Sequence, residues 1–265
     1  SYTGCFYCSE GGSGDFASDS SLPIAAQLSE ARRRLSSKTG CRKFIAYFQA
    51  FTNTYAPVEY LEKIFYEAIS DPSVCVLSIG TRTDCFNDEI YDLLSRLNSI
   101  KPVWIELGLQ SIHQSTLDAM NTHTKVSDFT VVCNELNKRS IKVIAHLILG
   151  LPGETKEMML ESVDFAAKSN IFGIKLQLLH VLRNTKLAEL YEKDPFPLFS
   201  LEEYCDFIVD CIERLPPGMV IHRMTGDGPR KLLIAPMWST DKKRVLNTIN
   251  QNLIKRNTYQ GRFFM

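Results

Sequence analysis

Residues 142–155 read KVIAHLILGLPGET, and this stretch decides the fold class. The apolar run over Lys142–Leu149 predicts a buried strand, and the Gly150-Leu-Pro-Gly153 segment after it predicts a tight turn. A helix is predicted to follow over Thr155–Ala167. A strand, a short turn and a helix together make one repeating unit of a parallel α/β fold.

The same alternation runs through the whole chain, with short apolar runs between longer amphipathic stretches. Strands are predicted at Phe44–Gln49, Cys75–Gly80, Val103–Leu109, Lys142–Leu149, Gly173–Leu179 and Met219–His222. Helices are predicted at Leu22–Ser37, Pro57–Ile69, Asn87–Leu97, Ser115–Met120, Ser127–Lys138, Thr155–Ala167, Leu201–Leu215 and Thr240–Ile254. We therefore expect an α/β protein built as a partial (β/α)6 barrel that resembles a TIM barrel, with a small C-terminal extension.

The composition is that of an ordinary globular protein, with 265 residues of which 45% are hydrophobic. Apolar runs are too short for a membrane span, and the first residues lack a signal-peptide pattern, so a cytoplasmic protein with no membrane contact is expected. The 30 basic and 30 acidic residues cancel, which gives no general attraction to nucleic acid. Asp241–Met265 is locally cationic, and taken alone this indicates a solvated helix face.

Polar residues follow the carboxyl ends of the predicted strands, which is where a β/α barrel builds its active site. Along Val103–Gln110 they alternate with apolar residues, so Trp104, Glu106, Gly108 and Gln110 share one face. Because helices cover the outside of such a barrel, we expect this face to line a pocket. The strand-end residues are Gln49, Thr52, Asn53, Thr81, Arg82, Asp84, Glu106, Gln110, Ser111, His146, Gln177, His180 and His222.

Two of the eight cysteines, Cys5 and Cys8, need a chemical explanation. Their Cys-x-x-Cys spacing suits a structural zinc site, a redox dithiol or an iron–sulfur cluster. Zinc would need about four ligands, and the chain has no second Cys-x-x-Cys pair. A redox dithiol should begin a helix, whereas a Gly-Ser segment follows here. A cluster fits a loop whose backbone can wrap inorganic sulfide. The cysteines within apolar segments are expected to be core thiols: Cys75, Cys133, Cys205 and Cys211.

The order of these motifs resembles the radical S-adenosylmethionine (SAM) superfamily. Cys5-Phe6-Tyr7-Cys8 is similar to the last two cysteines of that family's cluster motif. The segments after the strands resemble one bacterial branch of iron–sulfur oxidoreductases that is related to the catalytic subunit of Elongator. The segments that carry this resemblance are 48–54 (FQAFTNT), 80–84 (GTRTD), 106–111 (ELGLQS), 146–155 (HLILGLPGET) and 222–230 (HRMTGDGPR).

The resemblance implies a partial barrel of the radical SAM type over residues 1–199 and an associated extension over residues 200–265. It implies a [4Fe–4S] cluster held by Cys5 and Cys8, with the first strand and a third cluster cysteine upstream of residue 1. It also implies reductive cleavage of SAM to a 5′-deoxyadenosyl radical, with an external electron donor of the flavodoxin or ferredoxin type. The residues expected to contact SAM are Gln49, Thr52, Arg82, Glu106, Gln110, Ser111, Gly150 and Gly153.

The substrate is less well indicated than the cofactors. Three histidines on predicted strands and one acid are candidate catalytic residues: His146, His180, His222 and Asp84. Asp227, Arg223 and Arg230 are further candidates for substrate binding. The Elongator relationship implies a tRNA substrate, with a wobble uridine as the modified base. A small metabolite remains an alternative that the neutral net charge fits equally well, and a non-catalytic metal-binding scaffold is a third.

Overall fold

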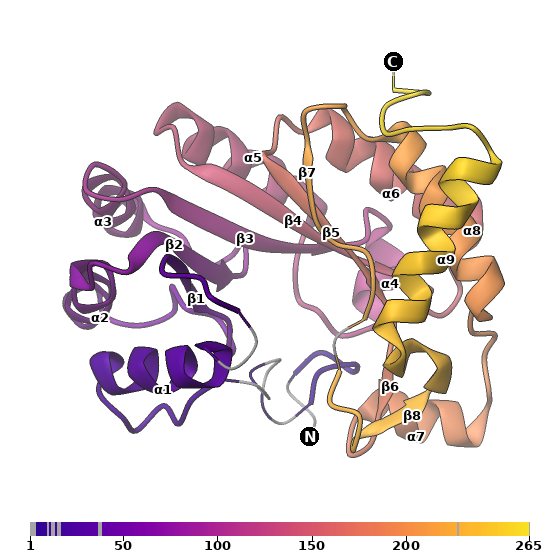
Figure 1. The fold of residues 1–265 in the computed structure, drawn as a ribbon, viewed down its shortest axis with the longest axis horizontal. Helices are drawn as coiled ribbons and strands as arrows, with labels where there is room; N and C mark the ends of the chain where they lie inside the picture. Colours follow the sequence, from indigo (N-terminus) through magenta and orange to yellow (C-terminus); the bar gives the residue numbers. More distant parts are fainter. Residues whose placement is uncertain are drawn as a thin grey trace. The chain divides into compact units, whose positions relative to one another are not determined.

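The computed structural model describes residues 4–9, 11, 14, 17–36, 39–226 and 228–264. Six strands form one sheet in the order β1-β2-β3-β4-β5-β7, and the strand pairs β1/β2, β2/β3, β4/β5 and β5/β7 are parallel. This confirms the predicted α/β class and the parallel sheet of a partial barrel (Figure 1). The strands are β1 (Phe44–Phe48), β2 (Val74–Thr81), β3 (Val103–Gln110), β4 (Lys142–Leu149), β5 (Gly173–Leu178) and β7 (Val220–Arg223).

Every helix that was predicted is present, and its ends lie within two residues of the predicted ends. Ser200 and Glu203 form a reciprocal capping box at the start of α8, and Thr155 caps α6 by accepting a hydrogen bond from the Met158 amide at 3.3 Å. The helices are α1 (Ile24–Ser36), α2 (Val58–Ser70), α3 (Asp88–Asn98), α4 (Gln114–Ala119), α5 (Val126–Lys138), α6 (Lys156–Lys168), α7 (Lys186–Lys193), α8 (Leu201–Arg214) and α9 (Lys242–Lys255).

Four elements were not predicted. Val181–Leu182 (β6) pairs antiparallel with Leu233–Ala235 (β8), and α7 follows β6 directly. A short 3-10 helix (Met237–Thr240) precedes α9, so the last helix begins two residues later than the prediction at Thr240.

The prediction for Cys75 was wrong, because this cysteine is exposed at the start of β2 and its thiol donates to the Phe44 carbonyl. Cys133, Cys205 and Cys211 are buried, as predicted.

The chain divides into two compact units. Unit 1 comprises Ser1–Glu10, Gly108–Thr130 and Ile144–Met265, and unit 2 comprises Gly11–Leu107 and Val131–Val143. In unit 1, α8 packs against α6 and α9 (Figure 1). In unit 2, α2 packs against α1, α3 and β2.

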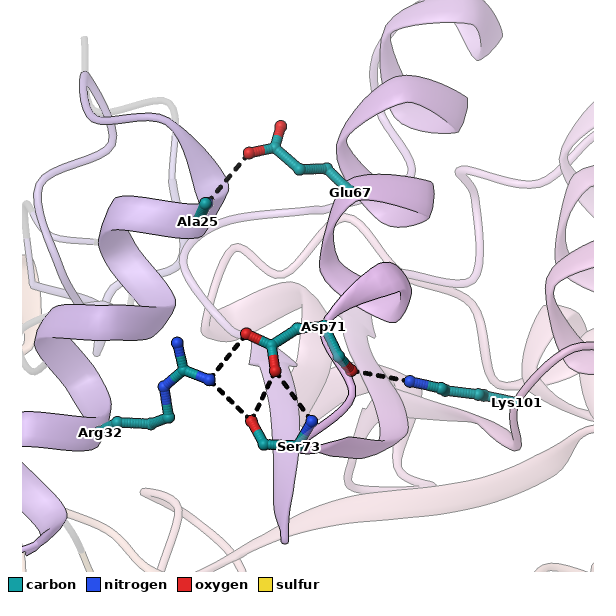
Figure 2. A network of polar contacts seen from close by, with 6 residues as sticks. All are labelled: Ala25, Arg32, Glu67, Asp71, Ser73 and Lys101. Atoms are coloured by element: carbon teal, nitrogen blue, oxygen red, sulfur yellow. Dashed lines mark hydrogen bonds and ion pairs between the residues drawn. The ribbon is translucent and has the colours of Figure 1, made fainter. Parts of the chain in front are cut away.

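A polar network joins α1 to the α2–β2 connection within unit 2 (Figure 2). Arg32 donates to the Asp71 carboxylate at 2.7 Å and to the Ser73 hydroxyl at 2.8 Å. The same carboxylate accepts the Ser73 amide at 2.9 Å and its hydroxyl at 2.6 Å. These hydrogen bonds, led by the one from the Ser73 side chain, hold the pKa of Asp71 below its usual value. Glu67 accepts from the Ala25 amide in the first turn of α1, where a negative charge stabilises the helix.

No helix in the described ranges combines the length and the apolar character that crossing a membrane requires.

Candidate functional site

The two cysteines of the N-terminal motif lie on a tight turn in unit 1. The Cys8 amide donates to the Cys5 carbonyl at 3.1 Å, and both cysteines are half-buried. The turn is anchored on both sides through Phe6. Its amide donates to the Met120 carbonyl at 3.0 Å, and its carbonyl accepts from the Leu187 amide at 2.8 Å. The sulfur atoms are therefore carried by a backbone that α4 and α7 hold in place.

The same turn is packed beside the ends of β4 and β5. Phe6 and Tyr7 contact an apolar cluster that includes Ile148, Leu151 and Leu179. Ile148 is near the end of β4, and Leu151 and Leu179 directly follow β4 and β5. Unit 1 therefore brings the cysteine turn next to the Gly150–Gly153 segment, as the predicted site requires.

Two thiols supply part of a ligand set for a metal centre. Among the described residues, no group of three or more His, Cys, Asp or Glu side chains is placed to hold a metal ion. Cys5 and Cys8 could supply two of the thiolates that an iron–sulfur cluster usually takes as ligands.

Gln110 shows a structural signature of a ligand contact at the end of β3. Its φ of +63° lies in the left-handed region, which few residues other than glycine adopt. Its side chain folds over Gly108, where an added Cβ would lie 2.6 Å from the amide nitrogen Nε2. The amide oxygen Oε1 is buried and accepts no hydrogen bond from the described residues. A buried acceptor without a donor is the environment expected where an N–H or O–H group of a cofactor binds.

Ser111 and Glu154 connect the segment after β3 to the turn after β4. The Ser111 hydroxyl donates to the Glu154 carboxylate and accepts from the His113 amide at 3.0 Å. Ser111 is completely buried. Burial raises the pKa of Glu154, although hydrogen bonds from Ser111 and Thr116 oppose this shift. Ser111 thus has protein partners for its hydroxyl, and the role predicted for it in SAM binding stays a prediction.

Both glycines of the Gly150–Gly153 turn are required by the backbone. Gly150 has a φ of +94° and Gly153 a φ of +85°, values that residues with a Cβ rarely adopt. An added Cβ at Gly153 would meet no atom within 4 Å, so the space beside this glycine is open. The turn therefore leaves backbone accessible, which is compatible with the contact with SAM predicted for Gly150 and Gly153.

A row of polar and basic side chains crosses β4, β5 and β7 within unit 1. His146 pairs in register with Lys175, and Lys175 pairs with Arg223. Arg223 donates to the Gln177 amide oxygen at 3.3 Å. The sequence analysis missed Lys175, which is only 6% exposed. Its alternation with Ile174 and Leu176 could have identified it, because that pattern puts Lys175 and Gln177 on one face.

The other two predicted histidines are packed in different places. The His180 imidazole accepts from the Gly228 amide at 3.2 Å through Nδ1, and an added Cβ on Gly226 would lie 2.1 Å from its Nε2. His222 lies beside Gly173 at the start of β5, with its ring centroid 5.8 Å from that of Phe172. His146 is in the middle of β4. The register puts His222 within one residue of the level of His146, whereas His180 follows the end of β5. Asp227 lies outside the described residues.

In unit 2 the loop after β1 carries Gln49 and Thr52, which are both half-buried. Asn53 holds this loop, because its Nδ2 lies 3.0–3.1 Å from three carbonyl oxygens, those of Phe48, Ala50 and Gly80. Thr54 continues the attachment by donating to the Cys85 carbonyl at 2.7 Å. The loop that carries Gln49 and Thr52, two residues predicted to contact SAM, is thus fixed to the end of β2.

Arg82 and Asp84 form a bidentate pair in the loop after β2. Arg82 donates to the two carboxylate oxygens at 2.9 and 2.5 Å, with side chains 41% and 38% exposed. Burial raises the pKa of Asp84, but hydrogen bonds and charge from Arg82 outweigh this, and the pKa falls below its usual value. Arg82 would have to release Asp84 to bind SAM, and its predicted contact with SAM stays a prediction.

Glu106 is buried on β3 and accepts a hydrogen bond from the Ser78 hydroxyl of β2 at 2.7 Å.

Burial, aided by the negative charge of Asp84, raises the pKa of Cys85 to about 11, so this thiol stays protonated at neutral pH.

Comparison with known proteins decides the family. The profile of the Radical SAM superfamily matches residues 3–166, and that of the Radical_SAM C-terminal domain matches residues 171–255. The chain belongs to the radical SAM superfamily. This confirms the predicted family, the enzyme class and the cofactors that define the family, a [4Fe–4S] cluster and SAM. It also identifies the partial barrel as one of the radical SAM type.

Individual relatives narrow the branch. The uncharacterized protein YtqA of Bacillus subtilis (strain 168) is 42% identical over 261 residues, covering 98% of this chain and 81% of YtqA. The structure of the archaeal Methanocaldococcus infernus Elp3 with an N-terminal deletion matches with a TM-score of 0.76 and 18% identity, covering 91% of this chain and 61% of that one. The tRNA uridine(34) acetyltransferase of Methanocaldococcus jannaschii is 27% identical over 169 residues, covering 60% of this radical SAM chain and 30% of that protein.

Proposed function

We propose that this radical SAM protein reductively cleaves SAM and modifies tRNA, with a wobble uridine as the target base. The observation that carries the choice of tRNA is the similarity to a relative named for its action on tRNA uridine 34. The fold shared with Elp3 over 91% of this chain supports the same branch. The cluster and SAM supply radical chemistry when bound, and an external donor of the flavodoxin or ferredoxin type would deliver the electron.

The chain's own residues would then hold and orient these groups. Cys5 and Cys8 would ligate two irons of the cluster, on a turn that Phe6 fastens to unit 1. Gln110 would accept a hydrogen bond from SAM through its buried Oε1, which has no donor among the described residues. The open backbone at Gly153 would let the cofactor approach closely.

The cationic segment Asp241–Met265 gives little support for RNA binding, because acidic side chains lie close to some of its arginines. Arg256 forms ion pairs with Asp206 and Asp210 of α8, so its charge is offset by the protein itself. Arg244 lies 3.8 Å from Glu202. Salt-dependent binding to phosphates needs cations that are not neutralised in this way.

A small metabolite is the second candidate substrate, because 30 basic and 30 acidic residues leave no net charge to attract RNA. Mass spectrometry of tRNA nucleosides from a strain that lacks the gene separates the two. Loss of one modified uridine, restored by the wild-type gene but not by a Cys8→Ser variant, is the expected result. A nucleoside profile identical to that of the parent strain would reject the tRNA substrate.

A further inference from the structure

The backbone turn at the end of β3 is strained. The Ser111 amide donates to the Leu109 carbonyl at 2.8 Å, so a three-residue turn is centred on Gln110, whose φ is +63°. A turn of this kind with a positive φ at its centre is rare and costly. It persists only where the surrounding structure holds it. Contacts next to Gln110 must therefore hold this conformation, and with it the position of the buried Oε1.

The two residues that follow Gln110 are held by hydrogen bonds to α6 and to the turn before it. Ser111 is completely buried, and its hydroxyl donates to the Glu154 carboxylate. The Ile112 amide donates at 3.1 Å to the hydroxyl of Ser162, which is 2% exposed. All five residues belong to unit 1. The strained turn is thus fastened directly behind Gln110.

Glu154 also closes the turn after β4, the strand next to β3 in the sheet. Its amide donates to the Leu151 carbonyl at 3.1 Å, and Gly153, with a φ of +85°, supplies the positive φ that a type II turn requires at its third residue. Its side chain accepts from Ser111 and makes a second hydrogen bond with the buried Thr116. One carboxylate therefore connects the turn after β4 to the strained turn after β3.

We propose that Ser111 and Glu154 are positioning residues for SAM, and that their hydrogen bond holds the turn at Gln110 and the turn at Gly153 in one arrangement. This inference rests on the SAM contact proposed for Gln110. Ser111 does not need to touch SAM, because its hydroxyl donates to Glu154 and accepts from the His113 amide at 3.0 Å. A group that binds a cofactor loses much of its effect when its support moves it by about 1 Å.

The test uses the full-length protein, reconstituted anaerobically with its cluster and left unreduced, so that SAM binds without being cleaved. Equilibrium dialysis measures the Kd of SAM, and iron and sulfide analysis gives the cluster content of each variant. Ser111→Ala and Glu154→Met break the Ser111–Glu154 link, whereas Glu154→Gln keeps an oxygen that accepts from Ser111. Asp241→Ala is the control, because it removes the N-cap of a different helix, α9.

Ser111→Ala and Glu154→Met should each weaken SAM binding by about tenfold, the effect of one lost hydrogen bond to the cofactor. Glu154→Gln and Asp241→Ala should bind SAM like the wild type. The double variant should bind no more weakly than the weaker single variant, because both substitutions break the same contact. Wild-type affinity in both link-breaking variants, no rescue by Glu154→Gln, an equal loss in Asp241→Ala or fully additive losses would overturn the proposal.

Gln110→Gly separates the Ser111–Glu154 link from the contact on which it rests. Glycine adopts the positive φ without strain and removes the amide side chain. Gln110→Gly should weaken SAM binding by itself, and Ser111→Ala should add little to that loss. Wild-type affinity in Gln110→Gly rejects the contact proposed for Gln110. A loss in Gln110→Gly beside wild-type affinity in Ser111→Ala and Glu154→Met rejects the positioning role alone, as does a full further loss when Ser111→Ala is added to Gln110→Gly.

Discussion

Replacing Asn53 by alanine should destabilise the protein by removing the group that holds the loop after β1. The Asn53 side chain contributes two N–H donors, and they serve three carbonyl oxygens at 3.0–3.1 Å. Each net hydrogen bond is worth about 1 kcal/mol, and the half-buried carbonyls lose further stability when left without a donor. We expect a loss of about 2–3 kcal/mol in the free energy of unfolding, or roughly 4–12 °C in Tm for a chain of this size.

Urea unfolding followed by circular dichroism measures this change, with all variants prepared in the same cofactor state. Asn247→Ala on the exposed face of α9 is the control, and its stability should stay within about 0.5 kcal/mol of the wild type. Asn53→Asp keeps the shape but has no donors at neutral pH, so it should be at least as destabilising as Asn53→Ala. If Asn53→Ala is no more destabilising than the control, the loop is not held in the way described.

Two further predictions concern stability. Asp71→Asn should cost about 1–2 kcal/mol at pH 7. Because the folded pKa of Asp71 is depressed, its contribution is complete above the unfolded pKa of about 4 and is lost as pH falls through the folded pKa. The stability difference between Asp71→Asn and the wild type should therefore shrink in acid; a constant difference down to low pH would contradict this. Gly226→Ala would place a Cβ 2.1 Å from the His180 ring and should cost about 1–3 kcal/mol. Gly218→Ala, with no atom within 4 Å, should be nearly neutral, and equal effects at the two glycines would reject the steric argument.

The longer helices and strands could be predicted because each spans enough residues for its hydrophobic pattern to repeat. The strand over Lys142–Leu149 was predicted with the observed bounds, since it ends at a glycine that must adopt a positive φ. Val181–Leu182 and Leu233–Ala235 were missed because two or three residues carry no measurable period, and they pair across about fifty residues of chain. Helix α7 had an available signal in Thr185, which caps its first turn.

The candidate site was predicted less completely than the fold. The cysteine motif and the glycine turn could be found because spacing and backbone chemistry mark them in sequence. The buried Lys175 was hidden inside an apolar run, and the pairing of Arg82 with Asp84 depends on side-chain geometry that spacing does not reveal. The histidines were treated as equivalent, whereas the His222 ring packs beside Gly173 and the His180 ring accepts a hydrogen bond from the Gly228 amide.

If the Cys5–Cys8 turn supports radical SAM chemistry, release of 5′-deoxyadenosine from SAM must depend on both cysteines. Full-length protein is reconstituted anaerobically with iron and sulfide, reduced with dithionite, and assayed for release of 5′-deoxyadenosine from SAM. The wild type should be brown and form this product, and Cys5→Ser and Cys8→Ser should lose both the cluster absorbance and the product. Product formation by either serine variant at the wild-type rate, or none by a wild-type protein with a full cluster, would contradict the account.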